Sequence, residues 1–123
     1  GAPNDEALRT IAQHDVVLDQ LRVGWYGGVA VEAMAMGKPV VAYLNAADLA
    51  LVSSDLRESL PIVRADPSNI EQCLRTLATG MRSQLRDIGA QSRAFVERWH
   101  NPSIIARFVV ECYARKSATG EKP

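Results

Sequence analysis

Two adjacent glycines, Gly27 and Gly28, precede a segment, residues 29–36, that the sequence predicts to be a helix. Glycine permits positive φ and lets a ligand approach the backbone closely. The free amides at a helix N-terminus, together with the helix dipole, favour an anion such as a diphosphate. Glu32 follows about one turn later, where its carboxylate could accept hydrogen bonds from the hydroxyls of a ribose. The pattern suggests a nucleotide site; the alternative is close helix–sheet packing at the glycines and a solvated Glu32.

Other residue types that carry chemistry are sparse. His14 and His100 are far apart in the chain, and no His/Cys cluster has the spacing of metal ligands, so no metal site is expected. His100 is expected to be a cation at a helix C-terminus. Cys73 and Cys112 fall within apolar helical patterns, which indicates buried, reduced thiols. The G-x-S-x-G motif of a serine hydrolase is absent from the sequence.

The first half of the chain predicts a strand–loop–helix–strand unit. Residues 15–18 and 40–44 are short apolar runs, and the second run is typical of a strand buried on both faces of a parallel sheet. The loop between the first strand and the helix covers residues 20–28. Gly37 stands where a left-handed residue would end the helix, and Pro39 prevents its continuation.

The second half predicts one more strand, residues 61–65, followed by helices. Ser68 and Glu71 form an S-x-x-E capping box, and Asn101 followed by Pro102 begins the last helix. The fold class is therefore α/β, with a Rossmann-like open parallel sheet of about three strands flanked by helices. A ligand site is expected at the carboxyl ends of the strands. The expected divisions are a lead-in and first helix (1–14), a partial Rossmann-like domain (15–115) and a disordered tail (116–123).

Composition excludes several classes of protein. The chain has 123 residues, with 14 basic and 14 acidic side chains and no net charge, which argues against a nucleic-acid-binding protein. No apolar run has the length of a membrane span, and the N-terminus lacks a signal pattern, so a cytoplasmic protein is expected. The C-terminal half is mildly basic. That half could bind peripherally to the anionic inner face of a membrane; alternatively, it is an ordinary solvated helical surface.

The segment GGVAVEAMAMGKPVVAYL, residues 27–44, resembles the donor-binding signature of retaining glycosyltransferases of the GT-B architecture, group 1 or family 4 type. In that family E-x7-E is followed by A-M-A-x-G-x-P-V, and residues 32–40 follow the end of this pattern residue by residue. The closing helices after the W-H-N-P turn are also similar, so the resemblance covers about residues 15–115. It implies that the chain is part of a GT-B C-terminal domain, which binds the nucleotide-sugar donor.

By resemblance, Glu32 holds the ribose, and Gly27, Gly28 and Val29 receive the donor diphosphate. The first glutamate of the family pair would stand at position 24, where this sequence has Gly24. In the family that residue touches the donor sugar near the reacting carbon, so the resemblance identifies no catalytic residue here.

Gly24, Trp25 and Tyr26 are the candidates for lining the sugar pocket; alternatively, Trp25 and Tyr26 pack on a neighbouring loop. The strands that carry a basic pair for the phosphates in the family are not recognisable in this sequence.

The resemblance implies a glycosyltransferase fragment that binds a nucleotide-sugar donor without a metal or other cofactor, and that alone lacks turnover. The rest of the enzyme, an N-terminal acceptor domain, would be its partner. Two alternatives remain: a GT-B nucleotide-sugar epimerase, and a non-catalytic α/β interaction module. The exposed edges of so small a sheet also predict self-association.

Overall fold

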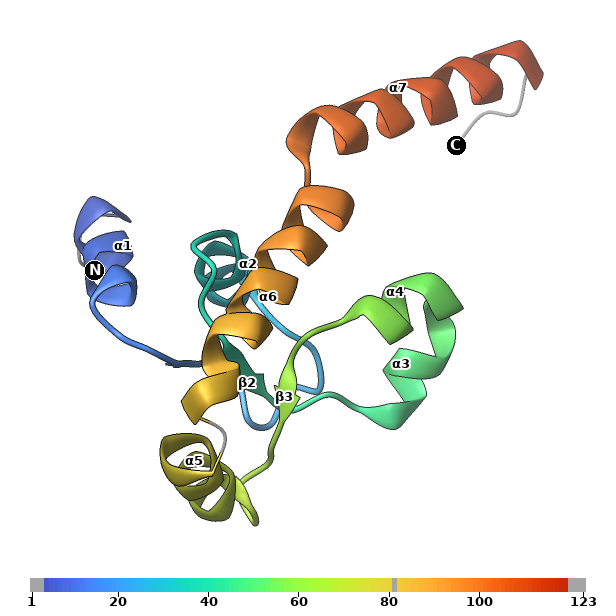
Figure 1. The fold of residues 1–123 in the computed structure, drawn as a ribbon. Helices are drawn as coiled ribbons and strands as arrows, with labels where there is room; N and C mark the ends of the chain where they lie inside the picture. The colour runs from blue at the N-terminus through green and yellow to red at the C-terminus, as the bar shows by residue number, and fades with distance from the viewer. Residues whose placement is uncertain (1–3, 81, 120–123) are drawn as a thin grey trace.

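A parallel three-stranded sheet forms the centre of the molecule (Figure 1). The computed structural model describes residues 4–80 and 82–119. The strands are β1 (Val17–Leu18), β2 (Val40–Ala42) and β3 (Val63–Arg64), in the spatial order β1-β2-β3. The α/β class and the small open parallel sheet are thus confirmed, with strands shorter than the apolar runs that predicted them.

The central strand β2 is buried along its whole length. Val40 and Ala42 belong to the core on one face of the sheet, and Val41 belongs to the core on the other face. Alternate residues of a strand point to opposite faces, so an all-apolar strand is needed where both faces are covered. The prediction of a strand buried on both faces is confirmed.

Helices cover both faces of the sheet. On the face of Val40 lie α2 and α6, which pack closely on each other, together with α1 and α4; on the face of Val41 lie α5 and the start of α6. The bounds are α1 Asn4–Ala12, α2 Gly28–Ala35, α3 Ala46–Leu51, α4 Ser54–Ser59, α5 Ile70–Thr79, the 3-10 turn η1 Arg82–Gln84, α6 Leu85–Trp99 and α7 Pro102–Thr119.

The end of α2 lies against the middle of α6. Gly37 has a φ of +71°, the Gly37 amide donates to the Met34 carbonyl, and the Lys38 amide donates to the Ala33 carbonyl, both at 2.9 Å. This pair of bonds is a Schellman motif, so the predicted left-handed end is confirmed. On α6, Gly89 faces the same turn so closely that a Cβ on Gly89 would overlap the Gly37 carbonyl oxygen and lie 3.1 Å from its carbon.

Two short helices, α3 and α4, occupy the segment that leads from β2 to β3, for which the sequence predicted no helix. The Asn45 side chain caps α3 by accepting the Ala47 amide at 2.9 Å, and Ser53 caps α4 by accepting the Leu56 amide at 3.3 Å. Asparagine and serine are preferred N-cap residues, so their spacing was the signal for these helices.

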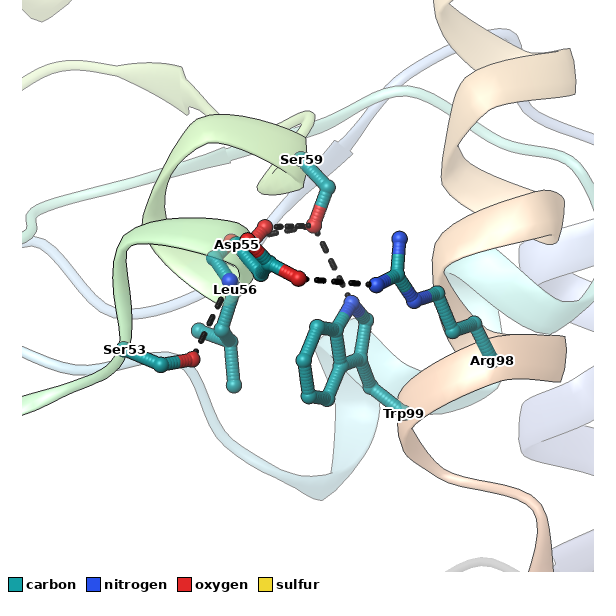
Figure 2. A network of polar contacts seen from close by, with 6 residues as sticks. All are labelled: Ser53, Asp55, Leu56, Ser59, Arg98 and Trp99. Carbon is teal, nitrogen blue, oxygen red and sulfur yellow. Dashed lines mark hydrogen bonds and ion pairs between the residues drawn. The ribbon is translucent and has the colours of Figure 1, made fainter.

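Polar contacts attach α4 to the end of α6 (Figure 2). The Trp99 indole N–H donates to Ser59 Oγ at 3.0 Å, and Ser59 Oγ donates to the Asp55 carbonyl at 2.6 Å. The Arg98 guanidinium pairs with the Asp55 carboxylate at 3.2 Å and lies over the Trp99 ring. The ion pair is exposed and contributes little to stability. The half-buried Trp99 is therefore the main contact that holds α4 against α6.

The predicted capping box is wrong. The Ser68 hydroxyl and amide both donate to the Asp66 carboxylate, which lowers the pKa of Asp66, and Glu71 pairs with Arg75 one turn later. The N-cap of α5 is Asn69, whose side chain accepts the Asp66 amide instead of capping the helix. Asp66 competes successfully for Ser68 because a charged acceptor forms the stronger hydrogen bond.

The last helix, α7, projects away from the other elements (Figure 1). Asn101 accepts the Ser103 amide at 3.0 Å and Pro102 is the first helical residue, as predicted. The helix continues to Thr119, past the predicted start of the disordered tail at residue 116; residues 120–123 lie outside the described part. Its Phe108 and Tyr113 are 60% and 71% exposed. No helix within the described residues has both the length and the apolar character needed to cross a bilayer.

Candidate functional site

The N-terminus of α2 lies at the carboxyl end of β1, where the sequence predicted a site. Gly27 is the N-cap residue in an extended conformation, and its carbonyl accepts the Val31 amide at 3.3 Å. The amides of Gly28, Val29 and Ala30 have no hydrogen-bond partner within the described residues. Nothing lies within 4 Å of a Cβ built on Gly28. Gly28 and Val29 are exposed, whereas Ala30 is 0% exposed, so the start of α2 offers two free amides at the surface, an arrangement that suits an anion.

A carboxylate that the sequence analysis missed lies at this helix start. Asp19 follows β1, its amide donates to the Val41 carbonyl at 3.0 Å, and its carboxylate accepts the Gly27 amide at 2.7 Å. A negative charge next to a helix N-terminus is stabilised by the dipole and repels a second anion. The amide of Gly27, one of the residues expected to receive the diphosphate, is thus occupied by Asp19, whereas the amides of Gly28 and Val29 remain free. An acidic residue directly after a strand was the available signal.

Glu32 is half-buried and forms no hydrogen bond or ion pair within the described part of the chain. Residues four apart lie on the same side of a helix, and side chains tilt toward its N-terminus. The Glu32 carboxylate therefore lies on the side of α2 that carries Gly28, displaced toward the free amides. A group bound at these amides would have this carboxylate within one helical turn.

Gly24, which stands where the resembling family has a glutamate, is buried with a φ of +93°. Its carbonyl accepts the Asn45 amide at 2.8 Å. A Cβ at this position would lie 2.9 Å from Asn45 Cβ and 3.4 Å from an Asp48 carboxylate oxygen. Both the backbone conformation and the neighbouring side chains therefore require glycine, so the loop has no room for the family's side chain.

We expect Gly24→Ala to lower the free energy of unfolding by about 1–3 kcal/mol, because the left-handed conformation and the contact with Asn45 both oppose a Cβ. Gly28→Ala is the matched control. Its Cβ would enter open space in the first turn of α2, so we expect unchanged or slightly higher stability. Urea unfolding of both variants measures the difference, and equal stability of the two would contradict the strain at Gly24.

The aromatic residues predicted to line a sugar pocket pack inward instead. Tyr26 is buried, stacks on Trp25 with 5.2 Å between ring centroids, and meets Phe95 edge-on at 6.3 Å. The Tyr26 hydroxyl is 3.0 Å from Nε2 of His100. Of the two interpretations left open for these residues, the structure therefore supports packing for Tyr26, while Trp25 remains half-buried.

His100 ends α6 as predicted, but its partial burial disfavours the cation that was expected there. Burial lowers the pKa of His100 and raises the pKa of Tyr26, so both side chains favour their neutral forms. A neutral imidazole whose Nε2 carries no hydrogen can accept a hydrogen bond from the Tyr26 hydroxyl. This contact joins the loop before α2 to the α6–α7 junction, a coupling across 74 residues of sequence.

No protein-family model, curated protein or solved structure matches this chain. The described residues contain no group of three or more His, Cys, Asp or Glu side chains that could hold a metal ion. Both cysteines are half-buried and free of disulfide bonds, and burial raises the pKa of Cys73.

Proposed function

We propose that this chain is the donor-nucleotide part of a glycosyltransferase, a Rossmann-like GT-B domain that binds the diphosphate and ribose of a nucleotide sugar. The observation that carries the proposal is the start of α2, where the free amides of Gly28 and Val29 lie at the surface and Glu32 follows one turn later on the side of Gly28. Residues 27–44, which resemble the family's donor-binding signature, contain all of these groups.

In the proposed complex the diphosphate lies against the exposed amides of Gly28 and Val29, and the ribose hydroxyls donate to Glu32. Backbone amides aimed at the diphosphate would stabilise the charge that develops on the leaving group during transfer. Arg22, on the loop before α2, is exposed and has no hydrogen bond or ion pair within the described residues, so it is available as a cation for the phosphates. The acceptor side would come from another domain of the same enzyme.

The test of this proposal is ligand-observed NMR with UDP, GDP, ADP and their sugar conjugates. We expect saturation transfer to the ribose protons of the cognate nucleotide, and a weakening of binding by about tenfold or more in Glu32→Ala, because the hydrogen bonds to a carboxylate are lost. The folding stability of this variant should not change, since Glu32 has no partner to lose.

Glu111→Ala is the matched control, because Glu111 is an exposed carboxylate on α7, in the part of the helix whose side chains are described. It should bind nucleotide as the parent chain does. Equal affinity of the Glu32 and Glu111 variants would contradict a ribose site at Glu32. If no nucleotide or sugar conjugate shows saturation transfer, the result would contradict nucleotide binding by this chain. It would favour the alternative, an interaction module in which the glycines serve packing alone.

A further inference from the structure

A cavity of about 290 Å³ lies at the amino ends of the strands, at the end of the sheet opposite the α2 site. Three of its lining residues are cationic: Lys38, just before β2, Arg82, in η1, and Arg86, at the start of α6. Asp15, which precedes β1, is the one carboxylate in the lining. The lining side chains thus carry a net positive charge, although the whole chain carries none.

The cationic groups of this cavity are not neutralised by ion pairs. Within the described residues, the side chains of Arg82, Arg86 and Asp15 form no hydrogen bond or ion pair, and the Lys38 ammonium bonds only the Ala12 carbonyl at 2.8 Å. The helix α6 begins at this cavity, so its dipole adds positive potential. Elsewhere in the molecule Arg75, Arg93 and Arg98 each pair with a carboxylate.

An apolar cavity adjoins the cationic one. Its volume is also about 290 Å³, and Asp15, Arg82 and Leu85 line both cavities, so the two lie side by side. Its remaining lining is apolar and comes mostly from α5, where Leu77 is 2% exposed and Leu74 is 40% exposed. We call the two parts the cationic lobe (Lys38, Arg82 and Arg86) and the apolar lobe (Val16, Leu74, Leu77, Ala78 and Leu85).

We propose that the two lobes form one binding site for an amphiphilic anion, with a phosphate or carboxylate head in the cationic lobe and a hydrocarbon chain in the apolar lobe. Guanidinium groups match the geometry of these oxyanions, and burial of the chain removes apolar surface of both partners from water. Inorganic phosphate would leave the apolar lobe empty, and a neutral amphiphile would leave the cations unpaired. The site lies apart from the α2 start, so it does not depend on the proposed donor function.

The experiment is an NMR titration of the ¹⁵N-labelled chain with octyl phosphate below its micelle concentration. Inorganic phosphate and octyl glucoside are titrated in parallel as head-only and neutral probes. We expect shift changes at amides around Val16, Lys38, Leu77 and Arg86, and affinity for octyl phosphate about tenfold or more above that for either probe. Equal affinity for octyl phosphate and either probe would overturn the proposal.

Two variants separate the lobes. The double variant Arg82→Gln with Arg86→Gln should weaken octyl phosphate binding by about tenfold or more, because two charge-assisted contacts are lost. Its matched control, Arg64→Gln with Arg107→Gln, removes two exposed arginines outside the site and should bind as before. Leu74→Asn should weaken binding of octyl phosphate and leave that of inorganic phosphate unchanged. Unchanged binding of octyl phosphate to the first double variant would overturn the site.

Sedimentation with vesicles distinguishes the two sources of such a ligand. Binding to both octyl phosphate and phosphatidylglycerol vesicles, but not to phosphatidylcholine vesicles, supports a membrane lipid as the ligand. Binding to octyl phosphate without vesicle binding supports a free amphiphile, such as an alkyl phosphate or a fatty acid. Vesicle binding without octyl phosphate binding would show attraction to a charged surface alone and would overturn the cavity site.

Discussion

Gly89→Ala is expected to lower the free energy of unfolding by about 3 kcal/mol, the upper part of the range for overpacking a core. A Cβ on Gly89 would overlap the Gly37 carbonyl oxygen, which belongs to the Schellman turn at the end of α2. Backbone cannot rotate away as a flexible side chain can, so α2 and α6 must separate. Because these helices form the most extensive contact between elements of the fold, the separation disturbs the core on this face of the sheet.

Ser92→Ala, three residues along the same helix, is the control for this prediction. Ser92 is 1% exposed and its Oγ has no hydrogen-bond partner within the described structure. Replacing it removes a buried unsatisfied hydroxyl, so we expect a free energy of unfolding unchanged or raised by about 1 kcal/mol. Urea unfolding of both variants measures the contrast. A Gly89→Ala chain with the parent midpoint would show that the α2–α6 contact is looser than the structure indicates.

The parts of the fold that the sequence predicted are those determined by neighbouring residues. The apolar run 40–44 predicted β2, Gly37 with Pro39 predicted the end of α2, and Asn101 with Pro102 predicted the start of α7. Each signal acts over a few residues through burial, a left-handed conformation or a cap. Where two local partners competed, as at Ser68, the sequence could not rank them, and the prediction of the cap was wrong.

The features missed at the site depend on contacts between distant segments. The Tyr26–His100 contact joins residues 74 positions apart. It makes Tyr26, a candidate pocket residue, part of the core, and it half-buries His100, which lowers the pKa of that imidazole and disfavours the expected cation. The Asp19 carboxylate reaches Gly27 only because β1 ends beside the start of α2. Sequence spacing predicted where a ligand would lie in the sheet, but not which side chains already occupy the neighbouring hydrogen bonds.

The second large effect is expected at Phe95. This side chain is 3% exposed and its ring lies 6.3 Å from that of Tyr26 and 5.8 Å from that of His100. We expect Phe95→Ala to lower the free energy of unfolding by about 3–5 kcal/mol through the cavity it leaves beneath Tyr26. The measurement is urea unfolding, with the same substitution at Phe108 as the control.

The Phe108→Ala control tests whether the loss of unfolding free energy in Phe95→Ala comes from burial of the ring or from the loss of any aromatic ring. It lies on α7 and is 60% exposed, so Phe108→Ala should change the free energy of unfolding by no more than about 0.5 kcal/mol. An equal loss of unfolding free energy at the two positions would contradict the structure, because α7 would then pack as tightly as α6.

The loss of the Phe95 ring should also affect the loop before α2. Phe95 supports Tyr26, and Tyr26 lies one residue before the N-cap of α2, so Phe95→Ala should loosen the loop that presents the free amides. A Phe95→Ala chain that remains folded should therefore show faster hydrogen exchange in residues 24–30 than the Phe108→Ala chain.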